Sequence, residues 1–440
     1  MKTHILCGER ELPVEVPDDA VTLSPSMSPP LPNPRESVHE VLIDPIGVLP
    51  LVSLAKDRKN ACVVISDVTR PVPNKIILPP ILETLESAGI ARQDITILIA
   101  TGMHRPNLGK ELEQVVGARI MADYRIVNHY CRKEEDLRKI AEIDGAPIEI
   151  NKHYLDADLK ILTGLIEPHM YAGYSGGRKS ILPGISSYKT MTFMHSFAMI
   201  DHPGVTNCKL QGNPFHKAGE EVARLAGVDF IVNVVINKQR ELVGVFAGHH
   251  TIAHYAGCKM VENLSVQQVE EPVDLVVTSA GGYPLDATFY QVSKGLIAAG
   301  NLLREGGTIV IACECREGLG SLEYCELVRE GRSAEEFMAL RSNPDNFVID
   351  QWCLQTTYQA LSKASRVYVY SPYLDEQELS AIGLIKIDDL QTAVTRLTAD
   401  HAKIAVSPEG PYVVGLLNKS NILPAQKNAP AHAPVGEHAR

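Results

Sequence analysis

The sequence predicts an α/β protein with two domains built on parallel or mixed β-sheets. Short apolar runs alternate with helix-length segments along the 440 residues, the order expected of sheets covered on both faces. The pattern starts again after a polar stretch at residues 267–272. We therefore expect an N-terminal α/β domain over residues 1–270 and a Rossmann-like α/β domain over 271–423. The last residues, 424–440, have few large apolar side chains and are expected to form a flexible tail.

The individual elements follow in order from local patterns. Residues 17–34 are rich in Pro and Ser and predict an extended connector, because each Pro fixes φ and lacks an N–H. Helical spacing of apolar residues predicts helices over 74–88 and 214–225. Short, largely apolar runs predict buried strands at 61–66, 95–100, 159–163, 230–235, 275–278, 308–312 and 367–370.

Charge and cysteine usage narrow the class of protein. With 42 basic and 53 acidic residues the net charge is −11, which argues against a nucleic-acid or anionic-membrane partner. We expect neither a secretory signal nor a membrane span, since no apolar run of suitable length is present. The nine cysteines form no Cys-x-x-Cys pair, which favours reduced thiols in the cytoplasm over a zinc site.

Polar clusters follow four of the predicted strands. They occupy residues 66–71, 101–106, 167–180 and 279–284. Because open α/β sheets bind ligands at the carboxyl ends of their strands, these loops are expected to share one cleft.

The glycine-rich segment 173–180 resembles a phosphate-binding loop without being one. A P-loop requires Gly-x-x-x-x-Gly-Lys-Ser/Thr, and Arg178 stands where the second glycine belongs, so ATP binding is not expected. The backbone at Gly176 and Gly177 is nevertheless suited to approach an anion, with Arg178 adding a charge. A tight solvent-exposed turn is the alternative.

Histidines are numerous, and few patterns among them are informative. His250 and His254 are four apart, as in a metal pair, but Thr251 stands where a metalloprotease helix carries glutamate, so a helix start on the surface is favoured. His104 and His169 lie in strand-end loops, and His195 lies in a segment expected to be helical. Taken singly, each of the three also fits a structural histidine.

Several motifs together resemble one family. They are Asp-Val-Thr-Arg-Pro at 67–71, Thr-Gly-Met-His-Arg-Pro at 101–106, the series His169, Lys179, His195 with intervals of 10 and 16 residues, and Tyr-Gln-Val-Ser-Lys at 290–294. In this order they resemble lactate racemase and its relatives over about residues 33–352. The resemblance implies a racemase or epimerase of small 2-hydroxy acids.

The resemblance also implies a cofactor. Family members carry a nickel-pincer nucleotide, a pyridinium-3-thioamide-5-thiocarboxylic acid mononucleotide with nickel, which here would be covalently attached at Lys179. Nickel would be held by a ring carbon, two sulfurs and one imidazole, that of His195. Soft sulfur donors with one imidazole suit nickel(II), and a single protein ligand would leave no multi-residue metal motif in the sequence.

The resemblance assigns roles to further residues. His104 and His169 would exchange protons with the substrate hydroxyl on its two faces while the cofactor ring accepts and returns hydride. Arg70 and Lys294 would clamp the substrate carboxylate, and because they come from both halves the active site should lie in the cleft between the domains. Asp67 would orient Arg70 or contact the cofactor. Other cofactor or substrate contacts are expected from Tyr171, Gly176, Gly177, Tyr290, Gln291 and Trp352, with core packing as the alternative for Trp352.

Two other functions remain as alternatives. An NAD-dependent 2-hydroxy acid dehydrogenase would show Gly-x-Gly-x-x-Gly after a strand, and no intact copy is found. A non-catalytic pincer-cofactor or metal-binding protein would be free to lose the histidine pair or the carboxylate clamp, and this sequence keeps both. The expected partners are a small 2-hydroxy carboxylate, with lactate as the first choice, and cofactor-maturation proteins. The oligomeric state is left open.

Overall fold

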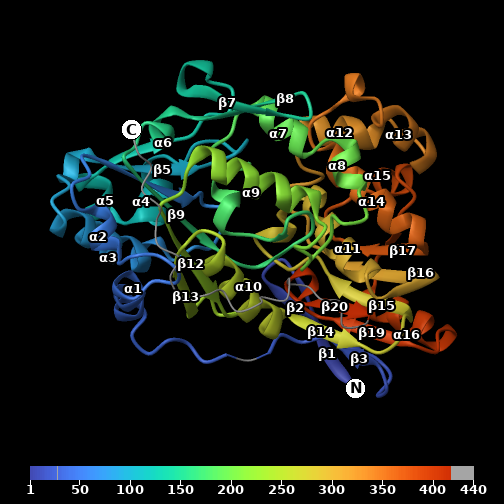
Figure 1. Cartoon of the computed structure of the whole chain (residues 1–440). Coiled ribbons are helices and arrows are strands. Elements are labelled where there is room, and N and C mark those ends of the chain that lie inside the picture. Colours follow the sequence, from blue (N-terminus) through green and yellow to red (C-terminus); the bar gives the residue numbers. More distant parts are fainter. Residues whose placement is uncertain (27, 418–440) are drawn as a thin grey trace.

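A computed structural model describes residues 1–26 and 28–417. The predicted tail, 424–440, lies outside the described residues, and so do the last residues, 418–423, of the second predicted domain. Two six-stranded sheets form the framework (Figure 1). Within the described residues, no helix is both long enough and apolar enough to cross a membrane.

The first sheet has the order β13-β12-β9-β4-β5-β6. All neighbours are parallel except β12 and β13, which are antiparallel. Its strands are β4 (Ala61–Ser66), β5 (Ile95–Ala100), β6 (Arg125–Asn128), β9 (Leu159–Leu165), β12 (Phe230–Ile236) and β13 (Leu242–Gly248).

The second sheet has the order β18-β17-β16-β15-β19-β3, and every neighbouring pair is parallel. Its strands are β3 (Val21–Thr22), β15 (Val273–Ser279), β16 (Leu303–Ala312), β17 (Ala364–Tyr370), β18 (Ile385–Ile387) and β19 (Ile404–Ser407). β15 is buried along its whole length and β16 from Gly307 to Ala312, which fits a sheet that is covered on both faces.

Four two-stranded ladders complete the strands of the described residues. They pair β1 (Lys2–Cys7) with β2 (Arg10–Glu15), β7 (Leu137–Ile143) with β8 (Ala146–Asn151), β10 (Pro168–His169) with β11 (Gly173–Tyr174), and β14 (Val266–Val269) with β20 (Val414–Leu417).

Helices cover the sheets. In the first half they are α1 (Pro34–Ile43), α2 (Leu51–Ala55), α3 (Asn74–Ser87), α4 (Gly109–Val116), α5 (Ala118–Asp123), α6 (Lys152–Leu155), α7 (Tyr188–Met194), α8 (Phe197–Asp201), α9 (Pro214–Ala226) and α10 (Ile252–Ser265). In the second half they are α11 (Ser293–Gly300), α12 (Leu322–Arg329), α13 (Ala334–Arg341), α14 (Gln351–Lys363), α15 (Glu376–Ala381) and α16 (Leu390–Asp400).

The predicted strands and helices are confirmed, and β4 shows why they form. Successive side chains of a strand point to opposite faces of the sheet. Val63 and Ile65 therefore pack in one apolar cluster with α1, α2 and α3, whereas Cys62 and Val64 pack on the opposite face with α9. A strand buried on both faces needs apolar residues at every position, which is the uninterrupted run seen in the sequence.

The two halves share one apolar cluster. Ile181 and Leu182 of the first half belong to the same cluster as Leu296 and Ile309 of the second. Apolar surface is thus buried between the halves and not only within each, which holds the carboxyl ends of the two sheets in a defined relation.

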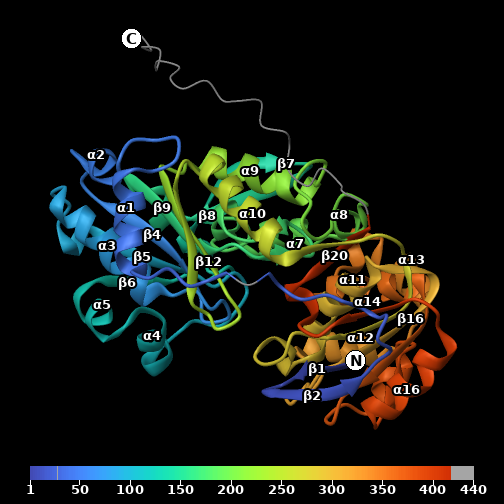
Figure 2. The same ribbon diagram turned by 90° about the horizontal axis from the view of Figure 1, so that it is seen from below.

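The N-terminal strands lie with the second sheet. Val21 in β3 pairs with Ala405 in β19, and Ile5 of β1 packs in one cluster with Leu275 of β15. Figure 2 shows β1 and β2, in blue, beside β16 and α16. The predicted domain boundary at residue 270 stays a prediction. The pairing of β3 with β19 nevertheless places residues of the predicted N-terminal domain in the second sheet. The pairing partners are more than 380 residues apart in the sequence, so local patterns carry no information about them.

Strand order places the binding crevice. From β4 the chain continues to β5 and β6 on one side and then returns to β9 on the other, so the order reverses between β4 and β9. In the second sheet β15 lies between β16 and β19 in the same way. Ligands of open α/β sheets bind outside the strand carboxyl ends at such reversals. The loops after β4, β9 and β15 carry most of the predicted site residues.

Candidate active site

The loop after β9 brings His169 and Lys179 together. β10 and β11 form a small hairpin in which His169 stands opposite Gly173, and a 3-10 turn at Gly177–Ser180 then carries Lys179 back. Lys179 Nζ lies 3.2 Å from His169 Nε2. The 10-residue interval in the sequence therefore corresponds to a loop that brings the two side chains together.

The hydrogen bonds of His169 define its protonation. Nδ1 accepts from the backbone N–H groups of Tyr171, at 3.1 Å, and Ala172, at 3.2 Å. A neutral ring must then carry its proton on Nε2, and that N–H points at Lys179. Because Nε2–H is a donor, Lys179 Nζ has to accept, which requires a neutral amine.

Burial and neighbouring cations favour the neutral forms of both groups. Burial, followed by the charges of Lys179, Arg70 and Lys294, holds the pKa of His169 well below its usual value. Burial, followed by the charges of Arg70, Arg178 and Lys294, likewise holds the pKa of Lys179 well below its usual range. A neutral lysine amine is the nucleophilic form, which the predicted covalent attachment at Lys179 would need.

Gly176 and Gly177 are required by close packing. Both have positive φ, at 76° and 52°. A Cβ at Gly176 would lie 2.9 Å from the side-chain oxygen of Asn233, and a Cβ at Gly177 would lie 2.9 Å from the ring of His254. Only glycine fits these positions, which gives a structural reason for the motif. Contact of this backbone with a cofactor stays a prediction.

His195 follows the end of α7, and its ring is held in place through Nδ1. The last carbonyls of a helix have no partner inside the helix, and that of Met191 accepts both from the backbone N–H of His195 and from its Nδ1–H, at 3.0 Å. The Nε2 lone pair is left to bind metal, the arrangement typical of metal-binding histidines. Burial lowers the pKa of His195 to about 4, so the ring is neutral near pH 7.

Aromatic side chains from both halves surround His195. Its ring centroid lies 4.7 Å from that of Trp352, 5.5 Å from Phe215 and 6.0 Å from Tyr171. The Tyr171 hydroxyl forms a hydrogen bond of 2.9 Å with Thr356 of α14. Trp352, which the sequence left between a site wall and core packing, is buried and packs directly on the predicted nickel ligand.

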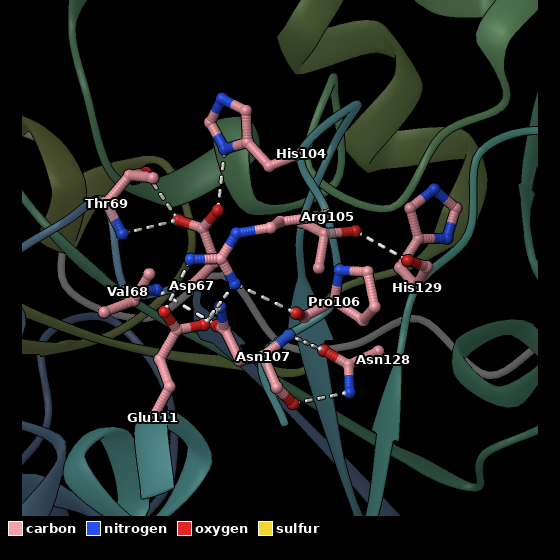
Figure 3. A network of polar contacts seen from close by, with 11 residues as sticks. Asp67, Val68, Thr69, His104, Arg105, Pro106, Asn107, Glu111, Asn128 and His129 are labelled. Atoms are coloured by element: carbon pink, nitrogen blue, oxygen red, sulfur yellow. Dashed lines mark hydrogen bonds and ion pairs between the residues drawn. The ribbon is translucent and has the colours of Figure 1, made fainter. Parts of the chain in front are cut away.

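Asp67 orients His104. Asp67 Oδ2 lies 2.7 Å from His104 Nδ1, and Oδ1 accepts from the Thr69 hydroxyl at 2.6 Å (Figure 3). Burial alone would raise the pKa of Asp67, but the hydrogen bond and charge of His104, with Thr69 and Arg70, lower it below its usual value. An ionised Asp67 keeps the proton of His104 on Nδ1 and leaves Nε2 as the base.

Arg70 has a partner that the sequence did not single out. Its guanidinium forms an ion pair with Glu167, the residue two before His169, so Glu167 and not Asp67 orients Arg70. Contact of Asp67 with the cofactor stays a prediction. Lys294, at the start of α11, belongs to the same group of charges: burial and then Arg70 lower its pKa to about 8, while Glu167 opposes the shift. The position of Glu167 in the sequence, two residues before His169, is the signal that could have identified it as part of the site.

Tyr290 and Gln291 lie in a short 3-10 turn that leads into α11. The Ser293 hydroxyl donates to the Tyr290 carbonyl at 2.9 Å, which joins this turn to the helix that carries Lys294. Both side chains are partly exposed. Their contact with substrate or cofactor stays a prediction.

A cavity of about 130 Å³ joins three of the four predicted loops. Its lining includes Asp67, Arg70, Thr101, His104, Gly176 and Lys179. The fourth loop, 279–284, is not part of this lining, since Tyr283 donates its backbone N–H to Gly8 in the β1–β2 turn.

Two other expectations near this loop are wrong. Arg178 does not face an anion: it is buried, donates to the carbonyls of Ala172 and Tyr174, and packs against the ring of His254. His254 does not lie on the surface with the helix start, because it is buried against Arg178 and the Ser175 carbonyl. The sequence spacing of Arg178 and His254 could not show that these side chains point into the protein.

The side chains fit the implied cofactor. Within residues 1–26 and 28–417, no three His, Cys, Asp or Glu side chains are grouped to hold a metal ion. A metal at His195 would therefore take its other ligands from a bound group, as in a pincer complex. The buried Nδ2 of Asn233, beside Gly176, has no hydrogen-bond partner within the described structure and is available to an acceptor on such a group.

Comparisons with known proteins agree along most of the chain. Residues 7–207 match the family model of the lactate racemase N-terminal domain, and residues 268–415 match that of the lactate racemase C-terminal domain. Curated lactate racemases from Thermoanaerobacterium thermosaccharolyticum and Lactiplantibacillus plantarum are 34% and 36% identical, each over 86% of this chain and 90% of the relative.

Solved structures agree with these matches. The lactate racemase apoprotein from T. thermosaccharolyticum superposes with a TM-score of 0.87 at 32% identity, over 94% of this chain and all of that one. A structural-genomics protein from Thermotoga maritima shares the fold, with a TM-score of 0.67 at 19% identity over 89% of this chain and all of that one.

Proposed function

The chain belongs to the lactate racemase family, and from this we propose that it interconverts the enantiomers of a short 2-hydroxy acid such as lactate with a nickel-pincer nucleotide attached to Lys179. The chain is accordingly an isomerase of the 2-hydroxy acid racemase class. The observation that carries the proposal is the contact between Lys179 Nζ and His169 Nε2, which requires a neutral, nucleophilic amine.

Lys179 and His195 would hold the cofactor. Lys179 supplies the amine for the covalent link, and His195 supplies one nitrogen ligand to nickel through Nε2. When bound, the nickel-pincer nucleotide supplies a hydride acceptor and donor, which avoids removing the weakly acidic α-proton of the substrate. Loading the cofactor would require separate maturation proteins.

Arg70 and Lys294 would bind the substrate carboxylate. Arg70 comes from the loop after β4 and Lys294 from α11 in the second half, so binding draws on both halves of the molecule. A guanidinium and an ammonium fix the carboxylate end and thereby the orientation of the α-carbon. The aromatic wall of Tyr171, Phe215 and Trp352 would exclude water from the reacting carbon.

His104 and His169 would move the hydroxyl proton. At His104, Nε2 takes the proton from the substrate hydroxyl while Asp67 stabilises the imidazolium through Nδ1–H. His169 directs Nε2–H at Lys179 before the cofactor is attached, and is assigned to the other face of the substrate once Lys179 carries the cofactor. Racemisation needs a proton carrier on each face, and the reverse reaction exchanges their roles.

The nine cysteines are free thiols, which supports a reducing, cytoplasmic compartment.

The decisive experiment co-expresses the protein with a pincer-synthesis system. The expected results are a mass adduct that peptide mapping assigns to Lys179, bound nickel, and racemisation of L-lactate in a chiral assay. A Lys179→Arg variant serves as the control, because it keeps a long side chain at this position but cannot form the link. An unmodified Lys179, in cells that do modify a known family member, would refute the proposal.

A further inference from the structure

Glu167 places a carboxylate inside a site whose proposed ligand is itself a carboxylate. It lies two residues after the end of β9 and pairs with Arg70. Its backbone is held on both sides by Ser175, whose N–H donates to the Glu167 carbonyl at 3.0 Å and whose hydroxyl accepts from the Glu167 N–H at 2.9 Å. The position of Glu167 is therefore built into the β10–β11 hairpin and is not that of a free surface side chain.

Burial holds the pKa of His169 well below its usual value, and the neighbouring groups that lower it further include Lys179, Arg70 and Lys294. In the proposed function, attachment of the cofactor consumes the amine of Lys179. Arg70 and Lys294 then remain, and Glu167 neutralises one of them.

The charge of Glu167 also reaches the second half of the molecule. It raises the pKa of Lys294, against the opposing effects of burial and Arg70, and after burial it is the first cause that raises the pKa of Tyr412. Asp67, whose pKa Arg70 lowers, adds a second negative charge near Arg70. Glu167 thus already occupies Arg70 before any substrate binds.

We propose that Glu167 determines specificity, so that the site accepts a 2-hydroxy monocarboxylate and rejects a substrate with a second carboxylate. The inference rests on the proposed function. One substrate carboxylate can share Arg70 and Lys294, but a second finds neither of them free and meets the charge of Glu167 in a partly buried site. Water and salt screen such repulsion weakly there.

The test compares Glu167→Gln with Glu167→Asp and with Glu221→Gln. Glutamine keeps the shape and a neutral hydrogen bond to Arg70, whereas aspartate keeps the charge. Glu221 is an exposed glutamate of α9 that pairs with Arg224, so its substitution controls for loss of one charge elsewhere. Thermal unfolding of each variant checks that the fold is retained.

Two readouts are used. With loaded enzyme, kcat/KM is measured for L-lactate and L-malate in chiral assays. With apoprotein, the Kd of each acid is measured by titration calorimetry. In Glu167→Gln we expect the preference for malate relative to lactate to rise about tenfold in both, and to change less than about threefold in Glu167→Asp and Glu221→Gln.

The outcomes separate this inference from the proposed function. If wild type racemises lactate and Glu167→Gln leaves the malate-to-lactate ratio unchanged, or if wild type prefers malate, the role of Glu167 is refuted and the racemase stands. If loaded wild type racemises no 2-hydroxy acid, the proposed function is refuted. The apoprotein titrations then decide the role of Glu167 alone: a selective gain in malate binding supports it, and no gain overturns it.

Discussion

Asp67 Oδ2 lies 2.7 Å from His104 Nδ1, and this contact makes the two proposed proton carriers unequal. His104 is half-exposed and has a buried carboxylate on one nitrogen. His169 has no carboxylate on its ring: two backbone N–H groups face Nδ1, and a lysine amine faces Nε2. An imidazolium is therefore stabilised at His104 and opposed at His169, so substitutions around the two histidines should have different effects.

Replacing Asp67 with Asn should lower kcat for lactate racemisation by about a hundredfold, the lower range for loss of general acid–base catalysis. The carboxamide can donate to Nδ1 and place the proton of His104 on Nε2, where it blocks the base. Chiral chromatography of product from either enantiomer measures the effect. Glu113→Gln, an exposed glutamate on the nearby helix α4, is the control and should have no effect. Normal turnover by Asp67→Asn would rule out the assigned role.

Replacing His195 with Ala should release nickel from cofactor-loaded protein. Loss of the single protein ligand should reduce the nickel retained after chelator treatment by about tenfold or more. Elemental analysis by mass spectrometry gives the metal content per chain. His250→Ala is the matched control, since His250 stacks on His249 away from the aromatic wall around His195. Equal nickel loss in both variants would mean that His195 is not the ligand.

Lys179 in the apoprotein should react with a small amine reagent such as cyanate at neutral pH. Because burial and neighbouring cations lower its pKa, its neutral fraction is larger than that of an ordinary lysine, and its labelling rate should rise less steeply with pH between about pH 7 and 9. Exposed Lys217 is the reference site for the same reagent. Peptide mass mapping compares the two sites. Parallel pH profiles would show that Lys179 is charged like a surface lysine.

Acid should destabilise the fold through its buried neutral histidines. His129 is buried between the Ser186 carbonyl and Asn151, and burial lowers its pKa to about 4. The unfolded chain binds a proton below its usual pKa near 6.5 while the folded chain does not. The free energy of unfolding therefore falls as pH drops from about 6.5 towards 4. His129 alone should contribute roughly 2 kcal/mol of the loss between about pH 7 and 5.

Urea unfolding at the two pH values measures this loss. His129→Gln should flatten the dependence, and His39→Gln, which replaces an exposed histidine, should leave it unchanged. If His129→Gln loses as much stability in acid as the wild type, His129 is not a source of the effect.

The elements of the fold were predictable because their signals are local. Residues 61–66 and 95–100 match β4 and β5 exactly, since a strand buried on both faces must be apolar at each position. The helix predicted over 214–225 begins with Pro214 after the cap Asn213, whose side chain accepts from the N–H of His216. Such signals lie within the residues that they specify.

Side-chain partners were not predictable in the same way. Asp67 was expected to orient Arg70, but the partner of Arg70 is Glu167, almost a hundred residues further along the chain. Arg178 was considered as an anion contact and instead points into the protein. The charges of Arg70 and Arg178 were evident from the sequence. The direction in which each side chain points depends on the residues that pack against its loop.

The sequence by itself determined the α/β class, the positions of the strands and the loops that carry His104, His169, Lys179 and Lys294, because periodicity and motif spacing are properties of short segments. Only the tertiary structure decided that β3 joins the second sheet, that Met191 holds the ring of His195 and that Glu167 occupies Arg70. Each of these depends on backbone positions set by packing, and side-chain hydrogen bonds act over about 3 Å, a scale on which sequence distance carries no information.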